Sequence, residues 1–277
     1  MWRGRRVSVI LPTYNERASL YAAIRDAWDT ECVDEIVVID NNAAPGSDTE
    51  ARRAGARVVY EPVQGYGAAI RRGLEESSGD LLIVSEPDGT FSAHDIVKLL
   101  AYSDDFDVVY GTRTTLQLIW GGANMGWWLR IGNMAVAKYL ELLFNTTQLT
   151  DVGCTLRLLH RAAYEEMAPH FTVRGSHFGV EMMVLSFLLG HRTIQVPVNY
   201  RRRVGTSSVT GNRVTAVKVG LQMVGLVTRR RLGGRERARP AQREAWTIEA
   251  AGRPVTADEA EPVEGDAPPP AMPLTAH

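Results

Sequence analysis

The chain has 277 residues, 45% of them hydrophobic and 23% charged, with a formal net charge of −1, which is the composition of an ordinary globular protein. Its two cysteines, Cys32 and Cys154, exclude a disulfide framework or a zinc motif, and we expect both to be small core residues in a reducing compartment. No run of about 18 apolar residues predicts a spanning helix, and the first residues lack a signal-peptide pattern, so we expect a protein that is soluble or attached to a membrane face.

Charge is unevenly distributed toward the C-terminus. Residues 201–239 contain eleven Lys and Arg but a single acid, whereas residues 240–277 contain two basic and seven acidic residues. Such opposite blocks are typical of a segment that binds a surface, followed by a solvated tail. We expect an anionic membrane surface, and no nucleic acid, as the partner of the basic segment.

Short apolar runs alternate with helical patterns over the first 110 residues. The runs predict strands at 6–11, 35–40, 57–60, 80–84 and 107–110. The patterns between them predict helices at 18–28, 68–76 and 95–101, and a short helix that runs through residue 52. This alternation predicts an α/β fold with a mostly parallel, Rossmann-like sheet flanked by helices. Because right-handed crossovers bring the carboxyl ends of parallel strands to one edge, the side chains that follow these strands should form a single site.

The second half of the chain is less regular. Residues 116–144 are apolar, with three tryptophans and several glycines, and predict either a core helix after a loop or a flap that faces lipid. A strand at 155–160, an apolar helix at 180–189 and a strand at 193–200 follow. Pro197 favours an edge position for this last strand, because proline cannot donate a ladder hydrogen bond.

Residues 214–228 form an apolar segment that is too short to span a membrane and is followed by Arg229, Arg230 and Arg231. An apolar face that ends in arginines is typical of an interfacial helix, in which each basic residue contributes about 1 kcal/mol of attraction to an anionic surface. The alternative is a helix packed on the core with a solvated basic end. From Gly233 onward, Ala, Pro, Glu and Arg dominate and predict disorder.

The stretch LLIVSEPDGTF, residues 81–91, contains the strongest candidate for a chemical site. Its apolar run ends at Ser85, and Glu86 and Asp88 then flank a proline beyond the carboxyl end of the strand, where open α/β sheets bind ligands. Two carboxylates at that place suit a divalent ion that also binds water and diphosphate oxygens. The alternative is a pair of solvated turn acids.

Three classes of enzyme could use such an edge. A dinucleotide oxidoreductase requires G-x-G-x-x-G after the first strand, where residues 12–16 read PTYNE instead. A P-loop enzyme requires the G-K-[ST] sequence, which this chain lacks. A nucleotide-sugar transferase fits the acids at the strand ends.

Seven motifs occur in a fixed order along the chain: VSVILPTYNE (7–16), EIVVIDN (35–41), GYGAAIRRGL (65–74), EPDGTF (86–91), GTR (111–113), DVGCTLRLLHR (151–161) and VPVNYRRRVGTSS (196–208). As a set they resemble the family-two inverting glycosyltransferases of the A-type fold, and most of all the dolichol- or polyprenyl-phosphate sugar synthases. The resemblance implies an A-type catalytic domain over residues 1–212. We expect an amphipathic helix at 213–232 and a disordered tail at 233–277 to follow it.

For the donor, the resemblance implies a pocket for the nucleoside of a nucleotide sugar, with a glycine loop whose backbone approaches the nucleotide closely. The nucleotide-binding positions would be Pro12, Tyr14, Glu16, Asp40, Gly65 and Gly67. Mg²⁺ or Mn²⁺, held by Glu86 and Asp88, would neutralise the charge of the leaving diphosphate.

For the acceptor, the resemblance implies a polyprenyl phosphate, with Asp151 and Asp88 as the catalytic acids. The second pKa of a phosphate monoester is about 6, so the acceptor needs little deprotonation and Asp151 would orient it. The planar, always-charged fork of arginine suits the acceptor phosphate. The acceptor-binding positions would be Arg113, Arg157, Arg202, Arg203 and Ser207.

The chain departs from the family pattern at four positions. Glu86 stands where relatives usually have Asp, Asn41 where they have an acid, Tyr66 where they have a basic residue and Ser208 where they often have Lys. Glu181 matches an acid in relatives, and it would either complement a helix dipole or contact a sugar hydroxyl.

Three functions follow from these patterns. The first is metal-dependent, inverting transfer of a hexose from a GDP- or UDP-sugar to a polyprenyl phosphate, by a protein peripheral on the cytoplasmic membrane face. The second keeps the transferase but gives it a soluble or secondary-metabolite acceptor and no affinity for anionic vesicles. The third is a non-catalytic nucleotide-sugar-binding protein, which the altered acids at Glu86 and Asn41 would explain.

Overall fold

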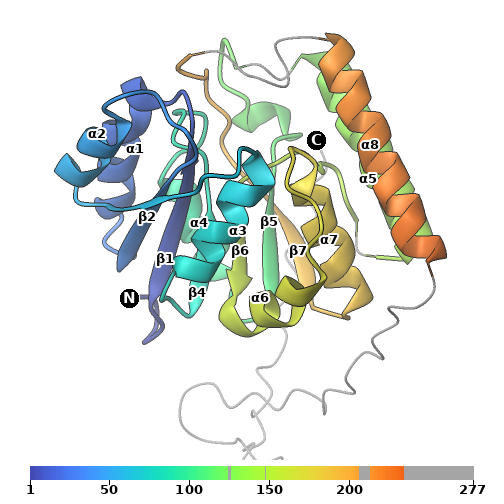
Figure 1. Ribbon diagram of the computed structural model, residues 1–277. Helices are drawn as coiled ribbons and strands as arrows, with labels where there is room; N and C mark the ends of the chain where they lie inside the picture. The colour runs from blue at the N-terminus through green and yellow to red at the C-terminus, as the bar shows by residue number, and fades with distance from the viewer. Residues whose placement is uncertain (124–125, 147, 206–212, 234–277) are drawn as a thin grey trace, which may run out of the picture. The chain divides into compact units, whose positions relative to one another are not determined.

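The computed structural model describes residues 1–123, 126–146, 148–205 and 213–233, all of which belong to one compact unit, residues 1–241. A seven-stranded sheet crosses this described part in the order β3-β2-β1-β4-β6-β5-β7 (Figure 1). Neighbouring strands are parallel except at β6, which is antiparallel to both β4 and β5. The predicted α/β fold with a mostly parallel sheet is confirmed.

The strands coincide with the apolar runs of the sequence. They are β1 (Val7–Thr13), β2 (Glu35–Asp40), β3 (Arg57–Tyr60), β4 (Leu81–Val84), β5 (Val108–Thr112), β6 (Arg157–His160) and β7 (Thr193–Pro197). Every residue of β1, β4 and β5 is buried, as expected for strands covered on both faces. β7 lies at the edge of the sheet and ends at Pro197, as the proline predicted.

The expectation that Pro12 ends the first strand was wrong. β1 continues to Thr13, and Pro12 pairs with Ile39 of β2. On the opposite side β4 is paired only as far as Ile10. The backbone N and C=O groups of Pro12 and Ile10 face that same side, because alternate residues of a strand direct their backbone hydrogen bonds to the same neighbour. The missing N–H of Pro12 therefore faces a side where no strand requires it.

Helices cover both faces of the sheet (Figure 1). One apolar cluster packs α1 (Arg17–Trp28), α2 (Ser47–Arg53) and α4 (His94–Ala101) against one face, and a second cluster packs α3 (Tyr66–Glu76), α6 (Arg161–Met167) and α7 (Phe178–Leu188) against the other. Two 3-10 turns lie at Leu116–Leu118 and Ala168–His170. Helix α6 was not predicted, because its seven residues are too few for a clear periodic pattern.

The two remaining helices, α5 (Trp127–Phe144) and α8 (Arg213–Leu232), lie side by side and both pack against α7 (Figure 1). In α5 the buried residues Ala137 and Leu140 join the core, whereas Trp127 remains 66% exposed. The core-helix alternative for residues 116–144 thus holds for the second half of α5, and the flap that faces lipid stays a prediction. Apart from Gly233, the predicted tail lies outside the described residues.

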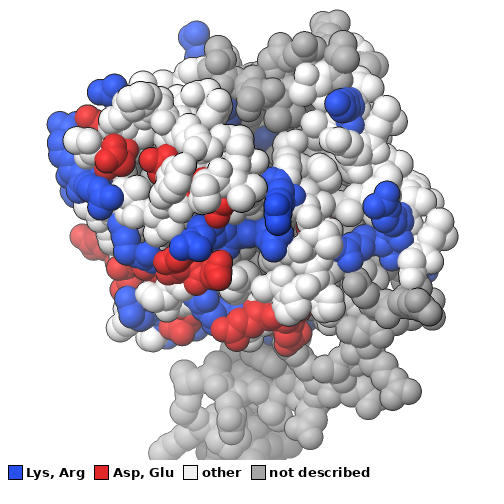
Figure 2. Space-filling view, viewed as in Figure 1, with Lys and Arg blue, Asp and Glu red and all other residues white. Residues whose placement is uncertain are grey.

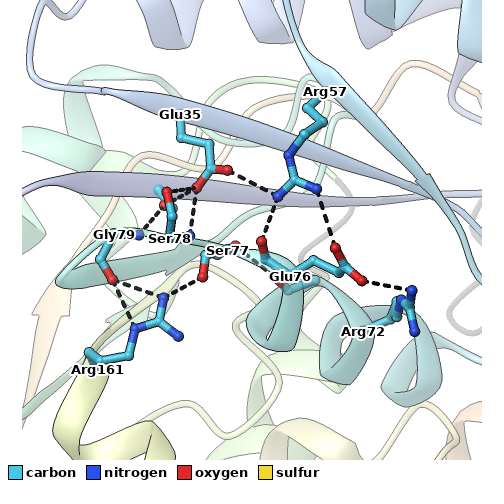
Figure 3. Close-up of polar contacts among 10 residues, drawn as sticks. Glu35, Arg57, Arg72, Glu76, Ser77, Ser78, Gly79 and Arg161 are labelled. Atoms are coloured by element: carbon cyan, nitrogen blue, oxygen red, sulfur yellow. Dashed lines mark hydrogen bonds and ion pairs between the residues drawn. The ribbon is translucent and has the colours of Figure 1, made fainter.

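A network of polar side chains lies at the end of the sheet where the parallel strands begin (Figure 3). Glu35 Oε2 accepts hydrogen bonds from Ser8 Oγ at 2.6 Å and from the Ser78 amide at 2.8 Å, and Glu35 Oε1 pairs with Arg57 at 3.0 Å. Arg161, at the start of α6, donates to the carbonyl of Gly79 at 3.0 Å. The network fixes the turn between α3 and β4, and so the position at which β4 enters the sheet.

The Glu35 carboxylate makes the unfolding free energy depend on pH. Burial raises its pKa, but the hydrogen bonds from Ser78, Ser8 and Arg57 outweigh burial and hold the pKa below 4.5. A depressed folded-state pKa contributes stability above the unfolded-state value, and this contribution is lost as the pH falls through the folded-state pKa. We expect Glu35→Gln to be less stable than wild type at neutral pH and to lose less stability between neutral pH and pH 3, measured by urea unfolding.

The matched control is Asp26→Asn, an exposed carboxylate on α1. Its unfolding free energy should follow that of the wild type across the same pH range. A Glu35→Gln curve parallel to the wild-type curve would contradict the assignment.

Candidate functional site

A cavity of about 780 Å³ opens beyond the carboxyl ends of the parallel strands, a size typical of ligand sites, which range over about 300–1,000 Å³. Its wall comes from segments far apart in the chain: 12–16, 64–66, 86–87 and residue 113 beside the sheet, 152–157 before and in β6, 175–180 at the start of α7, 129–136 in α5 and 216–224 in α8. Charged side chains gather at the sheet, and apolar side chains of α5 and α8 form the other wall.

The segment after β1 lies on the cavity as predicted. Pro12, Tyr14 and Glu16 all line it. Glu16 Oε2 accepts hydrogen bonds from the amides of Tyr14 at 2.7 Å and Asn15 at 2.9 Å. The Glu16 carboxylate therefore holds its own turn in shape and presents Tyr14, which is 46% exposed, to the cavity.

Asp40 does not line the cavity, whereas its neighbour Asn41 does. Asp40 Oδ1 accepts the amide of Ala43 at 2.8 Å. The buried Asn41 donates from Nδ2 to the carbonyls of Glu61 at 2.9 Å and Val63 at 2.8 Å. A carboxylate could not donate these two bonds. The amide at position 41, a departure from the family pattern, therefore fixes the loop at 61–65 that forms part of the cavity wall.

The glycines at 65 and 67 make a close contact within the protein that was not predicted, and their approach to a nucleotide stays a prediction. A Cβ on Gly65, whose φ is +153°, would collide with the carbonyl oxygen of Arg174, and a Cβ on Gly67 would lie 2.7 Å from Cβ of Phe178. Gly65 lines the cavity and Gly67 does not. Their small size lets the start of α3 pack against the loop before α7.

Glu86 and Asp88 stand together, with Arg203 between them. Arg203 Nη2 donates to Glu86 Oε2 at 2.8 Å and is also paired with Asp88 Oδ2. Thr90 donates from its amide to Asp88 Oδ1 at 2.9 Å and from its hydroxyl at 2.5 Å. Burial and the charge of Asp88 raise the pKa of Glu86 to about 8, although Arg203 opposes the shift. A second negative charge beside Asp88 is therefore disfavoured at this site as long as no further cation is bound.

The donor set at this pair fits a hard divalent cation. Asp88 is fully buried, and its Oδ2 accepts no hydrogen bond of regular geometry from the described residues. Carboxylate oxygens are the ligands that Mg²⁺ and Mn²⁺ prefer. Within the described ranges no cluster of three or more His, Cys, Asp or Glu side chains could hold a metal. A cation at this pair would take its remaining ligands from water and a bound phosphate.

Asp151 forms a buried, two-pronged ion pair with Arg113. Arg113 Nε donates to Oδ2 at 2.9 Å and Nη2 donates to Oδ1 at 3.1 Å, while the Gly153 amide donates to Oδ1 at 2.9 Å. Burial raises the pKa of Asp151, but the Arg113 guanidinium and these donors outweigh burial and hold the pKa below its ordinary value. Gln195 accepts the Asp151 amide at 3.3 Å. Asp151 therefore positions Arg113, which lines the cavity.

Arg157, the first residue of β6, is a buried cation on the cavity wall. Its guanidinium donates to the carbonyls of Gly179, at 2.8 Å, and of Cys154, and lies 5.5 Å from the ring centre of Tyr110. No carboxylate in the described part of the chain forms an ion pair with Arg157. Its charge is thus available to an anion in the cavity.

The other predicted acceptor residues divide into two groups. Arg203 lines the cavity, whereas Arg202 is exposed and lies away from the cavity, with its alkyl chain beside Gly122. Ser207 lies outside the described residues. Electrostatic interactions link Glu86 with Arg113, and Tyr66 with both Glu86 and Arg157. Glu86, Arg113, Arg157 and Arg203, which were predicted from separate motifs, therefore line one cleft, whereas Asp40, Asp88 and Asp151 do not line it.

Sequence reasoning did not anticipate that α5 and α8 would form a wall of this cavity. The α8 residues that face it include Ala216, Gly220, Met223 and Val224. Their spacing of three and four residues marks one face of a helix and was readable in the sequence. The spacing of these residues does not indicate which part of the protein the apolar face of α8 packs against.

Residues 8–168 match the family model described as glycosyl transferase family 2. The chain belongs to this family, and the protein is a glycosyltransferase that uses a nucleotide sugar as its donor. An uncharacterized glycosyltransferase of Mycobacterium tuberculosis is 30% identical over 214 residues, which are 76% of this chain and 92% of the relative. A dolichyl-phosphate hexose transferase of Haloferax volcanii is 26% identical over 209 residues, 73% of this chain and 86% of the relative.

Solved structures agree with the fold. Glucosyl-3-phosphoglycerate synthase from Mycobacterium tuberculosis, in complex with Mn²⁺, UDP and glucosyl-3-phosphoglycerate, superposes with a TM-score of 0.64 at 20% identity and covers 83% of this chain and 81% of its own. The same enzyme with Mg²⁺ and UDP gives a TM-score of 0.63 at 20% identity, covering 83% and 80%. The predicted A-type glycosyltransferase fold is confirmed.

Proposed function

We propose that the protein transfers a hexose from a nucleotide sugar to a polyprenyl phosphate, with inversion, as a peripheral protein on the cytoplasmic face of a membrane. The observation that carries the proposal is the two-part wall of the cavity. Acids and arginines line its end at the sheet, and apolar side chains of α5 and α8 line the other end. An acceptor with a phosphate head and a hydrocarbon tail matches both parts.

Glu86 and Asp88 would hold Mg²⁺ or Mn²⁺ at the donor diphosphate. The fit rests on the fully buried Asp88, on Glu86 beside it with 20% of its side chain exposed, and on Asp88 Oδ2, which accepts no hydrogen bond of regular geometry from the described residues. The related synthase crystallised with Mn²⁺ or Mg²⁺ beside UDP supports this assignment. When bound, such an ion stabilises the charge that develops on the leaving diphosphate.

The residues of the chain would bind and orient the two substrates. Tyr14 and the turn held by Glu16 would pack against the nucleoside, while Arg157, and Arg113 held by Asp151, would bind the acceptor phosphate. The acceptor is already anionic near neutral pH because its second pKa is about 6. Its oxygen would attack the anomeric carbon opposite the diphosphate, forming one C–O bond as the other breaks, without a proton-abstracting base.

The outer surface of α5 and α8 supports attachment to a membrane. Trp127 and Leu142 of α5 and Leu232 of α8 are all more than half exposed, and none of them lines the cavity. On the side where Figure 1 draws these helices, Figure 2 shows blue basic groups on a white ground, and most red acidic groups lie on the other side of the view. We propose that residues 213–232 rest on an anionic membrane, next to the catalytic domain of residues 1–212. Among the described residues, no helix has both the length and the apolarity of a membrane span.

Attachment should depend on the two outward arginines at the end of α8. Arg229 and Arg231 are exposed, whereas Arg230 donates to Glu181 at 2.8 Å inside the protein. Each basic residue near an anionic surface contributes about 1 kcal/mol, so replacing both with glutamine should weaken binding to phosphatidylserine vesicles by more than about tenfold, measured by flotation. Replacing Arg52 and Arg53 of α2 instead should leave binding unchanged. Equal losses from both double variants, or none from either, would contradict a membrane-facing α8.

A second candidate is transfer to a soluble phosphorylated acceptor. It is favoured by the structural similarity to glucosyl-3-phosphoglycerate synthase, and it would use Arg113 and Arg157 in the same way. Membership of the glycosyltransferase family argues against the third possibility, a non-catalytic binding protein.

A donor and acceptor screen tests the function. The full-length protein, with Mn²⁺, is given labelled UDP- or GDP-hexoses and either polyprenyl phosphate or 3-phosphoglycerate, and products are partitioned between chloroform and water. We expect label in the chloroform phase with one donor and only when polyprenyl phosphate is present. Label only in a water-soluble product would establish the second candidate and overturn the first.

A further inference from the structure

Arg203 occupies the place between the two acids at which the proposed function would put the cation. Its Nη2 atom contacts both Glu86 Oε2, at 2.8 Å, and Asp88 Oδ2. The Arg203 side chain is 21% exposed, that of Glu86 is 20% exposed and that of Asp88 is 1% exposed. A single nitrogen of Arg203 thus lies against one oxygen of each carboxylate in a place largely shielded from water.

The backbone holds Arg203 in this place. The amide of Val204 donates to the carbonyl of Asp88 at 2.9 Å, and the amide of Arg201 donates to the carbonyl of Thr90 at 2.8 Å. The segment 201–204 is therefore hydrogen-bonded along the loop that carries the acid pair. The contact of Arg203 with the acids follows from the packing of two chain segments that are 117 positions apart in the sequence.

Arg203 is the one cation in contact with the acid pair among the described residues. Its guanidinium faces two carboxyl groups, while Arg157 carries a buried positive charge without an ion-pair partner among the described residues. A divalent cation would neutralise both carboxylates and leave Arg203 without a partner. Arg203 lines the same cavity as Arg113 and Arg157, and its guanidinium would then face the phosphate groups that those arginines approach.

We propose that Arg203 is an exchangeable counter-ion, which stabilises the Glu86–Asp88 pair before a divalent cation binds and, once displaced by the cation, turns to the phosphates of the bound substrates. This inference rests on the proposed function in one respect, the assignment of Glu86 and Asp88 as cation ligands. In the protein without substrates, Arg203 therefore competes with the cation for Glu86 and Asp88. A residue that supported the metal site would instead strengthen metal binding.

Direct metal binding tests the exchange. Mn²⁺ is titrated into the full-length protein without nucleotide, and its affinity is measured by calorimetry and by the electron paramagnetic resonance signal of free Mn²⁺. Because Arg203→Gln removes the competing charge, we expect it to bind Mn²⁺ about tenfold more tightly than wild type, equivalent to about 1.4 kcal/mol. Arg203→Lys, which keeps the charge without the planar fork, should lie between them. Arg202→Gln, on the exposed neighbour, should bind as wild type does.

Thermal unfolding provides a second readout that also checks folding. Without metal, Arg203→Gln should have a lower Tm than wild type, because the two acids lose their counter-ion, and saturating Mn²⁺ should raise its Tm by more than it raises that of wild type. Equal or weaker Mn²⁺ affinity in folded Arg203→Gln would overturn the exchange and leave the proposed function standing. No Mn²⁺ binding by any of these proteins would overturn the assignment of Glu86 and Asp88, on which both depend.

Discussion

Asp88→Asn is expected to lower kcat/KM for sugar transfer by about a thousandfold, equivalent to about 4 kcal/mol of transition-state stabilisation. The substitution removes one of two negative charges from the proposed cation site, and a metal contributes several kcal/mol to the stabilisation of a leaving group. Asparagine keeps the Oδ1 atom that accepts both hydrogen bonds from Thr90, so the loop should retain its shape. Initial rates with the donor found in the screen would measure the effect.

The matched control is Asp105→Asn, an exposed carboxylate in the turn after α4, which should transfer sugar at the wild-type rate. Mn²⁺ titration of Asp88→Asn should show a parallel loss of affinity. A threefold difference in rate is equivalent to only about 0.7 kcal/mol. A transfer rate of Asp88→Asn within about threefold of wild type would therefore show that the reaction does not depend on this carboxylate.

Glu181→Gln is expected to lower the unfolding free energy by about 3 kcal/mol, the cost of removing one partner from a buried ion pair. Glu181, in the first turn of α7, is fully buried and accepts hydrogen bonds from Arg230 at 2.8 Å, from the amide of Val173 at 2.8 Å and from the hydroxyl of Thr172 at 2.6 Å. A neutral amide would remove the negative charge that Glu181 places against the inward-facing Arg230. Urea unfolding followed by circular dichroism would measure the loss.

Arg229→Gln is the control for this prediction, because it removes an exposed charge one position away and should change the unfolding free energy by less than about 0.5 kcal/mol. If Glu181→Gln were as stable as Arg229→Gln, the ion pair would not be what secures α8 to α7. The position of Glu181 also bears on the two roles considered for it, which were to complement a helix dipole or to contact a sugar hydroxyl, and it gives no support to the sugar contact. Its side chain joins α8 and the loop at 172–173, and it does not line the cavity.

The sheet was predictable because its strands are short apolar runs with acids or turn residues at their ends. Ile36, Val37, Val38 and Ile39 pack alternately into the two apolar clusters, so the run EIVVID shows both its strand character and its burial on two faces. The antiparallel direction of β6 was not predictable. It depends on the return path of the chain through α5, whose packing partners α7 and α8 come later in the sequence.

The site residues that come just after strands were predictable from the sequence. The ion pairs between residues far apart in the sequence were not. Glu86 and Arg113 come just after strands and line one cleft, and Asp88 contacts Arg203 of the same cleft. The pairing of Asp151 with Arg113, and the inward turn of Arg230 between two arginines that face outward, join residues at least 38 positions apart. The family resemblance assigned Asp151 and Arg113 to the acceptor, and the basic segment assigned Arg230 to a membrane surface, whereas both ion pairs depend on the folded chain.

The reversed strand β6 has a consequence for how this enzyme could change its acceptor. Arg157 begins β6 and pairs with Val84 and Tyr110 near the carboxyl ends of β4 and β5, so the chain enters the sheet from the substrate side at this strand. Residues 113–156 thus leave and rejoin the sheet at the same edge. Insertions or exchanges within this excursion would remodel the part of the cavity where we propose that the acceptor binds, without shifting the register of any strand, so it is the place at which to engineer a new acceptor preference.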